Sequence, residues 1–242
     1  MNAGRRILVT GASKGIGRAT LDRLRADGYE VVGLARSRPD DLADDAHFHQ
    51  IDVSDLAATR SLIERLAADR PFYGLINNAA IASAGTIMDT TPDEMNRLAH
   101  LNVNALLVCT QAVLPGMRAQ GVGRIVNVSS RAAMGKAERS AYSASKAALL
   151  GLTRTWALEL GADGITVNAI APGPVATEMF NTTSPPDHPR TQALMASVPV
   201  QRVGQPDEIA HAVAYLVDAR AGFMTGQTLH IDGGLTVSAT HL

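Results

Sequence analysis

Tyr142 and Lys146, four residues apart, are the first residues in this sequence that suggest chemistry. They lie in a stretch with helical periodicity, where a spacing of four places both side chains on one face. A tyrosine hydroxyl has an ordinary pKa of about 10, so it transfers protons near neutral pH only when a neighbouring cation favours the phenolate. Lys146 can supply that charge, which makes Tyr142 a candidate general acid and base for interconverting a carbonyl and an alcohol.

Two serines, Ser129 and Ser130, end the strand-like run that precedes Tyr142. A serine hydroxyl at this place can hold a carbonyl oxygen beside the tyrosine and stabilise the negative charge that develops on it. A tyrosine and lysine with this spacing are common by chance, and alone they are more typical of an ordinary amphipathic helix than of an active site. The interpretation therefore depends on the rest of the chain.

A glycine-rich turn near the N-terminus indicates a second group of site residues. Residues Thr10–Gly17 read T-G-A-S-K-G-I-G and lie between a short apolar strand and a helix-period stretch. Glycines let the backbone turn sharply and approach a pyrophosphate, whose charge the amides and dipole of a helix N-terminus stabilise. The spacing departs from the G-x-G-x-x-G dinucleotide fingerprint, so the prediction depends on strand, turn and helix occurring together.

The end of the second strand-like run indicates which dinucleotide is preferred. In dinucleotide-binding folds this position meets the adenosine ribose, where a carboxylate accepts from the 2′-hydroxyl and an arginine pairs with a 2′-phosphate. Here Ala35 and Arg36 occupy it, and Lys14 adds a positive charge from the glycine turn. We therefore expect NADP(H) to be preferred, with NAD(H) as the alternative if Arg36 is only a solvated charge.

Short β-branched runs alternate with helix-period stretches along the chain, which is typical of parallel β-α-β units. The strand-like runs are mostly apolar throughout, as expected when helices cover both faces of a sheet. We predict strands at Ile7–Val9, Val31–Ala35, His47–Asp52, Leu75–Asn77, Ile125–Ser129, Thr166–Ile170 and Thr228–Ile231. We predict helices at Ile16–Ala26, Leu56–Ala68, Pro92–Met117, Tyr142–Leu160 and Pro206–Leu216. The expected fold class is α/β, a single-domain doubly wound (Rossmann-type) parallel sheet of seven strands with helices on both faces, over residues 1–242.

Composition argues against several other classes of protein. Of 242 residues, 46% are hydrophobic and 19% are charged, and the formal net charge of −1 gives no attraction to nucleic acid or anionic membranes. Cys109 is the only cysteine, and the histidines, His47 and His49 included, lack a metal-ligand spacing, so we expect no metal site. We see no signal peptide after Met1 and no apolar run long enough to span a bilayer, so we expect a cytoplasmic protein.

A proline-rich segment breaks the alternation of strands and helices late in the chain. Asn181–Pro189 contains Pro185 and Pro186 and is predicted to be irregular. Such a segment beside a cofactor site would form a mobile lid over the substrate, which we place around residues 178–200.

Together these motifs closely resemble those of the short-chain dehydrogenase/reductases, over essentially the whole chain. The matching motifs are Thr10–Gly17, Asp52-Val53, Asn77–Ala80, Asn102, Ser130, Tyr142–Lys146, Pro172-Gly173 with Thr177, and Asp232–Gly234. The resemblance implies an oxidoreductase that passes a hydride between a nicotinamide dinucleotide and a small-molecule carbonyl or alcohol. It also implies a catalytic tetrad of Asn102, Ser130, Tyr142 and Lys146, in which Asn102 holds a water in a proton relay to Lys146.

The same resemblance assigns cofactor contacts. It implies that Asp52 and Val53 meet the adenine, that Asn78 and Ala79 flank its ribose, and that Thr177 meets the nicotinamide carboxamide. Lys146 in this family also binds the nicotinamide ribose. The expected cofactor-binding residues are Gly11, Ser13, Lys14, Gly15, Ile16, Gly17, Arg36, Asp52, Val53, Asn78, Ala79, Tyr142, Lys146, Pro172, Gly173, Val175 and Thr177.

Two positions depart from the family pattern. Ala80 stands where the family's Asn-Asn-Ala-Gly motif ends in glycine, and the added methyl group is small. Ser130 lies twelve residues before Tyr142, whereas thirteen is the more frequent interval and would select Ser129. We favour Ser130 because it matches the second serine of the family's strand end, which leaves Ser129 a structural role.

The motifs leave the substrate open, since the family reduces sugars, steroids, quinones, short alcohols and carrier-bound 3-oxoacyl chains. The carrier-protein reductases have an arginine just before their Gly-Ile-Thr-Val-Asn stretch, where this chain has Asp163, whose charge would repel an acidic carrier. We therefore rank a free carbonyl or alcohol above a 3-oxoacyl-(acyl-carrier-protein) substrate. Arg131, Lys136 and Arg139 either favour an anionic substrate or are solvated. A non-catalytic dinucleotide sensor is a further alternative, disfavoured because all four tetrad residues are present.

Small residues on the helix that carries Tyr142 suggest an assembly. Ala144, Ala147, Ala148 and Gly151 permit close packing of helices, and family resemblance implies that such helices pair between subunits. We expect a homotetramer, with Leu235–Leu242 near a neighbouring subunit.

Overall fold

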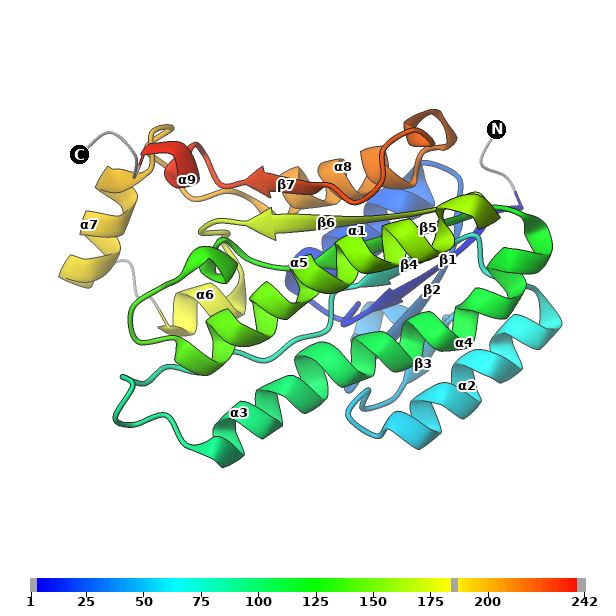
Figure 1. Ribbon diagram of the computed structural model, residues 1–242, viewed down its shortest axis with the longest axis horizontal. Helices are drawn as coiled ribbons and strands as arrows, with labels where there is room; N and C mark the ends of the chain where they lie inside the picture. The colour runs from blue at the N-terminus through cyan, green and yellow to red at the C-terminus, as the bar shows by residue number, and fades with distance from the viewer. Residues whose placement is uncertain (1–3, 184–186, 239–242) are drawn as a thin grey trace.

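A computed structural model describes residues 4–183 and 187–238, and within these ranges seven parallel strands form one sheet (Figure 1). Their order is β3-β2-β1-β4-β5-β6-β7. The strands are β1 (Arg6–Thr10), β2 (Glu30–Ala35), β3 (Phe48–Gln50), β4 (Gly74–Asn77), β5 (Gly123–Val128), β6 (Ile165–Pro172) and β7 (Thr228–Ile231). The order reverses between β1 and β4, the switch point at whose carboxyl edge doubly wound sheets bind ligands. The expected fold class is confirmed, and each predicted strand is present with small changes of bounds.

Helices cover both faces of this sheet (Figure 1). One face carries α1 (Gly15–Ala26) and α8 (Pro206–Val217), and the other carries α2 (Leu56–Asp69), α4 (Ala105–Gln120) and α5 (Ser140–Leu160). Along β1, Ile7 and Val9 join the core under the first pair, while Leu8 joins the core under the other three. Successive side chains point to opposite faces, so both must be apolar, which explains the unbroken apolar strands.

The helix predicted at Pro92–Met117 is interrupted. The structure has α3 (Pro92–Ala99), then a π-helical turn at His100–Asn104, then α4, which Gly121 ends in a left-handed conformation with φ of 61°. By length and composition the run Pro92–Gln120 could cross a membrane, contrary to our expectation that no apolar run is long enough. Half of its most apolar stretch is buried inside the domain, where α4 packs against α2 and the sheet, so it is a core helix.

The segment expected to be irregular carries two helices. These are α6 (Glu178–Thr183) and α7 (Pro189–Ser197), so the prediction is wrong for the last residues of α6 and for Pro189, while residues 184–186 lie outside the described part. Proline is compatible with the first turn of a helix because its missing amide has no partner there. The hydroxyl of Thr177 accepts from the amide of Phe180 at 3.2 Å and holds the start of α6. Both helices lie beyond the carboxyl edge of the sheet, at the left of Figure 1.

Candidate active site

The glycine turn between β1 and α1 lets a ligand approach the backbone closely. Gly11 and Gly15 have φ of 68° and 57°, in the left-handed region that favours glycine. A Cβ at Gly17 would lie 2.1 Å from the carbonyl oxygen of Gly11, so no larger residue fits there. Helix α1 begins at Gly15, and no side chain caps its first amides. These amides are therefore suited to the pyrophosphate of a dinucleotide, so the residues present fit such a cofactor.

Asn78 ties the end of β4 to this turn. Its side-chain amide donates to the carbonyl oxygens of Thr10 at 3.0 Å and of Gly11 at 3.2 Å. The hydroxyl of Thr10 accepts in return from the backbone amides of Asn78 at 3.0 Å and of Ala79 at 3.1 Å. The two strand ends at the switch point are thus held together, and the side chain of Asn78 acts on the turn's shape.

Arg36 is exposed at the end of β2 and has no hydrogen bond or ion pair in the described part of the chain. Nearby Arg38, in contrast, donates to the carbonyl oxygens of Leu42, Ala43 and Asp45 and is held by the chain itself. Backbone hydrogen bonding from Ser54 lowers the pKa of Asp52. At this end of the site, Arg36 therefore remains available for a ligand.

Lys14 forms an ion pair with the first residue of α6. Its ammonium group lies 2.6 Å from a carboxylate oxygen of Glu178, the first residue of α6, with both side chains about two-thirds exposed at 66% and 68%. An exposed pair of this kind contributes little free energy, so a phosphate can displace it. The positive charge expected from Lys14 is nevertheless partly offset by Glu178, which the sequence analysis did not foresee.

The two serines at the end of β5 have different surroundings. The buried hydroxyl of Ser129 donates to the carbonyl oxygen of Lys146 at 2.8 Å and joins β5 to α5. The hydroxyl of Ser130 accepts from the amide of Ala132 at 3.1 Å and forms a side-chain hydrogen bond with Tyr142. The geometry therefore favours Ser130 as the group that faces the reaction.

Tyr142 and Lys146 lie on one face of α5, with the lysine nitrogen 5.9 Å from the centre of the tyrosine ring. Burial raises the pKa of Tyr142, while the hydrogen bond with Ser130 and the charge of Arg139 act in the opposite direction. Burial also lowers the pKa of Lys146 to about 8, and its ammonium group donates to the carbonyl oxygen of Val128 at 2.8 Å. Burial therefore has the largest effect on the pKa of Tyr142, and the stabilisation of its phenolate by Lys146 stays a prediction.

Asn102 lies in the π-helical turn and is 1% exposed. Its side-chain amide donates to the carbonyl oxygen of Ile81 at 3.0 Å and to the hydroxyl of Ser145 at 2.9 Å, and its side-chain oxygen accepts from the amide of Ile81 at 2.9 Å. Both amide hydrogens are thus used within the protein, and the expected water relay to Lys146 stays a prediction. The geometry gives it a positioning role between the loop after β4 and α5.

A single cavity of about 380 Å³ joins these groups at the carboxyl edge. All seventeen expected cofactor residues line it, and so does Ser130, whereas Asn102 lies behind its wall. The cavity is also lined by Phe180 and Leu194, from the segment 178–200 that was expected to cover the substrate. Further lining residues that the sequence analysis did not assign include Ser37, Ile51, Ile81, Leu101 and Leu235. The position of Ser37 next to Arg36 could have indicated it, but no local pattern marks Leu235, which reaches the cavity only through the fold.

The matched motif at Asp232–Gly234 has a structural role. The carboxylate of Asp232 accepts from the amides of Gly234 at 3.0 Å and Thr236 at 2.8 Å. A Cβ at Gly173 would lie 2.7 Å from Asp232, so the residue that follows β6 must be glycine for the turn after β7 to pack against it. This packing positions Pro172 and Gly173 at the cavity.

Comparison with known proteins agrees with this arrangement. A family model described as enoyl-(acyl carrier protein) reductase matches residues 11–236. The 3-oxoacyl-(acyl-carrier-protein) reductase FabG of Salmonella typhimurium is 37% identical over 243 residues, covering 96% of this chain and 97% of the relative. A solved short chain dehydrogenase/reductase family protein is 37% identical with a TM-score of 0.87, covering 98% and 99% of the two chains. The crystal structure of a putative NAD(P) dependent gluconate 5-dehydrogenase from Beutenbergia cavernae, with bound NADP at low occupancy, is 33% identical with a TM-score of 0.90, covering 97% and 98% of the two chains.

Proposed function

Since the chain belongs to the short-chain dehydrogenase/reductase family, we propose that it is an NADPH-dependent reductase. Membership of this family makes it an NAD(P)(H)-dependent oxidoreductase that interconverts a small carbonyl and an alcohol. The observation that carries this proposal is the single cavity that connects Arg36 and the glycine turn with Ser130, Tyr142 and Lys146. One end fits a 2′-phosphorylated dinucleotide, and the other fits proton transfer to a carbonyl oxygen.

We propose the following roles for the catalytic groups. A nicotinamide dinucleotide bound along the cavity supplies the hydride in reduction and accepts it in oxidation. The hydroxyl of Ser130 donates a hydrogen bond to the substrate oxygen, and the hydroxyl of Tyr142 transfers its proton to that oxygen. The ammonium group of Lys146 stabilises the tyrosinate that remains, and Asn102 positions the loop and helix around them.

The pKa shifts favour reduction near neutral pH. Burial raises the pKa of Tyr142, which keeps its hydroxyl protonated and ready to donate. Lys146, with its pKa lowered to about 8, is still mostly charged at pH 7 and can stabilise the tyrosinate. Alcohol oxidation requires Tyr142 as the base, so this direction is favoured at higher pH.

The cofactor preference is tested by the dissociation constants of NADPH and NADH. Because Arg36 has no partner in the described part of the chain, Arg36→Asp should weaken NADPH binding by about tenfold or more while leaving NADH binding unchanged or stronger. Arg65→Asp is the matched control, since Arg65 is an exposed arginine on α2 that does not line the cavity. Equal losses for both cofactors, or tighter NADH binding by the native protein, would show that Arg36 does not read a 2′-phosphate.

Reduction of a 3-oxoacyl thioester is the second candidate function, because FabG is 37% identical over nearly the whole chain. We argued from the sequence that the charge of Asp163 would repel an acidic carrier protein, but in the structure Asp163 is paired and lies far from the cavity. Asp163 accepts from Arg118 at 2.8 Å and precedes β6 at the amino edge, whereas the cavity lies at the carboxyl edge. A panel of aldehydes, ketones, oxo acids and 3-oxoacyl thioesters separates the two candidates, since carrier-type reductases should turn over the thioesters fastest.

We also propose a homotetramer. Leu158, on α5, is 87% exposed, as expected for a large apolar side chain that another subunit covers. Leu235–Ser238 form α9, while residues 239–242 of the expected subunit contact lie outside the described part. Light scattering checks the assembly, and a monomer would contradict it. A cytoplasmic location stays a prediction from the sequence.

A further inference from the structure

Three cations lie at the substrate end of the cavity. Arg131, Lys136 and Arg139 line it together with Ser130 and Tyr142. We propose that this group, the cationic cluster, binds a carboxylate of the substrate, so that the enzyme acts on oxo acids or hydroxy acids. The inference rests on the proposed function and names the substrate class of the same site.

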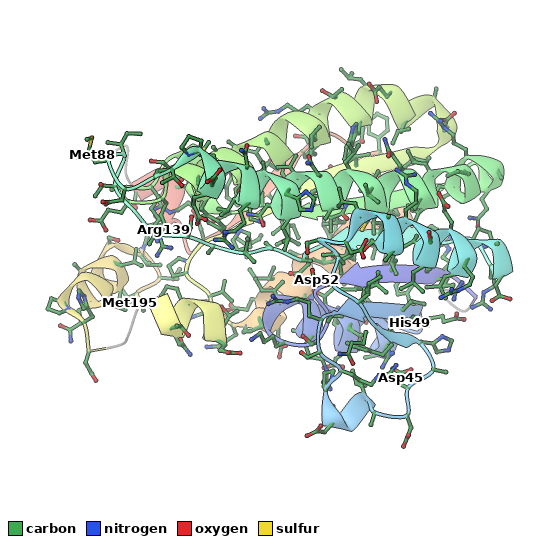
Figure 2. All side chains as sticks on the ribbon, turned by 90° about the horizontal axis from the view of Figure 1, so that it is seen from below. Asp45, His49, Asp52, Met88, Arg139 and Met195 are labelled. Carbon is green, nitrogen blue, oxygen red and sulfur yellow. The ribbon has the colours of Figure 1, made fainter. Side chains whose placement is uncertain are left out.

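Arg139 is fixed beside the reacting groups. It precedes α5 and lies three residues before Tyr142, and its guanidinium donates to the carbonyl oxygen of Ser83 at 2.8 Å. The amide of Gly85 donates to the carbonyl oxygen of Glu138 at 2.9 Å, which joins the two loops at this point. Figure 2 shows Arg139 between the loop that carries Met88 and the lid helices, where Met195 is labelled. The other nitrogens of its guanidinium have no hydrogen bond among the described residues, so they can receive a ligand.

The positive charge of the cationic cluster is not neutralised by the cavity. Among the described residues, the carboxylates that line the cavity are Asp52 and Glu178. Asp52 accepts from the amide of Ser54 on the adenosine side, and Glu178 pairs with Lys14. Glu138 is near in sequence but does not line the cavity. Among the described residues, the lining of the substrate end therefore provides no counter-charge for the cationic cluster, and an anionic group of the substrate would supply it.

Lys136 shows the cost of this arrangement. Its side chain is exposed to solvent, and partial burial of the ammonium group, followed by the charges of Arg139 and Arg131, lowers the pKa of that group. Like charges held together without a counter-charge lose free energy, and such arrangements are concentrated at sites that bind or react. The N-terminus of the 21-residue helix α5 begins at Ser140 and adds a partial positive charge at the same place.

The rest of the substrate end is apolar. Ile81, Phe180, Leu194 and Leu235 line it, so the cavity fits a compound with an apolar body and one charged end. A guanidinium binds planar oxyanions through paired N–H groups, which suits a carboxylate beside an ammonium group. A phosphate monoester presents related chemistry and is separated from a carboxylate by the test.

The first experiment compares matched charged and neutral substrates. The pairs are acetoacetate and methyl acetoacetate, levulinate and methyl levulinate, and dihydroxyacetone phosphate and dihydroxyacetone, each measured as kcat/KM with saturating cofactor. The native enzyme should prefer at least one oxo acid over its ester by about tenfold or more. Preference for the phosphate ester in place of the oxo acids would overturn the carboxylate assignment.

Substitution of Lys136 then tests the cluster itself. Lys136→Gln removes one charge from a side chain that has no hydrogen bond in the described part, so folding should be retained. It should lower kcat/KM for the oxo acid about tenfold more than for the ester, mainly through KM. Arg65→Gln is the matched control outside the cavity. Equal effects of Lys136→Gln on acid and ester would overturn the proposal while leaving the oxidoreductase function intact.

A binding measurement covers the case in which no probe is turned over. Isothermal titration compares isobutyrate with isobutyramide, which have nearly the same shape and differ in charge, on the native protein with and without NADP⁺. Tighter binding of isobutyrate that Lys136→Gln removes supports the cluster even if the proposed reductase activity fails. Equal affinity of the two probes overturns the inference, whatever the cofactor and turnover experiments show.

Discussion

Buried cations lie at both edges of the sheet, and their surroundings differ. At the amino edge, Arg6 is 5% exposed and lies 3.0 Å from a carboxylate oxygen of Glu30. It also donates to the carbonyl oxygens of Leu66 and Arg70 at 2.6 and 2.8 Å. At the carboxyl edge, Lys146 is 3% exposed, donates to one carbonyl oxygen, and pairs with no carboxylate in the described part of the chain.

The difference separates structural charge from functional charge. Burying a cation costs free energy unless counter-charge and hydrogen bonds compensate it. The amino edge provides both for Arg6, although its Nε has no aligned hydrogen bond among the described residues and burial still lowers the pKa of Arg6. The carboxyl edge provides no carboxylate for the buried Lys146 in the described part of the chain. Arg36 and Lys136 are exposed there and make no hydrogen bond or ion pair among the described residues. We infer that ligands bind and the reaction occurs where cations lack a counter-charge in the protein. A cation that already pairs within the protein has less interaction energy left for a substrate.

The largest expected effect is that of Tyr142→Phe, which removes the proposed acid and base but keeps the ring. We expect kcat to fall by about 10² to 10⁴-fold, the usual contribution of general acid–base catalysis. The measurement is steady-state turnover of the best substrate from the panel, with the dissociation constant of NADPH as a control that should change little. A loss of less than threefold would remove Tyr142 from the mechanism.

The sequence predicts local features of the carboxyl edge well, because short-range geometry determines them. The glycine turn, the strand ends and the pair Tyr142 and Lys146 follow from residue types and spacing within a few positions. Residue spacing does not give the contrast between Ser129 and Ser130, which only the family resemblance predicts, since one residue reverses the direction of a side chain and the loop length is irregular. The π-helical turn at Asn102 also escapes prediction, because its helical periodicity resembles that of the neighbouring α-helices.

Contacts between distant segments could not be predicted in the same way. The ion pair of Arg6 with Glu30, and that of Lys14 with Glu178, join residues from separate elements. Only the packed fold brings them together, and each residue alone is typical of an ordinary surface charge. Which charges in the cavity are paired and which are not can therefore be determined only from the structure.

Arg6→Met tests the amino edge. The substitution removes a buried partner, which typically costs 3–5 kcal/mol, and we expect about 3 kcal/mol because Glu30 keeps an ion pair with Arg70. Turnover per folded molecule should be unchanged, since Arg6 does not line the cavity. Urea unfolding and kcat measured on the same samples check both statements. A loss of kcat without a loss of stability would contradict the division between the two edges.

Lys146→Met tests the incomplete compensation at the carboxyl edge through the pH dependence of stability. Burial lowers the pKa of Lys146 from its ordinary value of 10.5 to about 8, so between these values the unfolded chain binds more protons and stability rises with pH. The free energy of unfolding should gain about 2 kcal/mol from this group between pH 8 and pH 10. Above pH 10 the raised pKa of Tyr142 acts in the opposite direction.

The measurement for Lys146 is urea unfolding at pH 8, 9 and 10. Lys146→Met should remove the rise, whereas Lys14→Met, which replaces an exposed lysine, should keep it. The same rise in the Lys146→Met protein would mean that Lys146 is not the group responsible. The comparison of slopes is needed because other groups titrate in this range and contribute equally to both proteins.

The smallest expected effect is that of Ser129→Ala, which sharpens the assignment of the two serines. The substitution removes the hydrogen bond to the carbonyl oxygen of Lys146, and we expect a loss of about 1 kcal/mol in stability. Turnover should stay within about threefold, because that hydroxyl joins β5 to α5 and is not free to hold a substrate oxygen. Ser130→Ala, measured alongside, should instead lower kcat by about tenfold or more with little change in unfolding. The reverse pattern would show that the more frequent interval of thirteen residues selects the catalytic serine, and that the hydrogen bond of Ser129 opens when substrate binds.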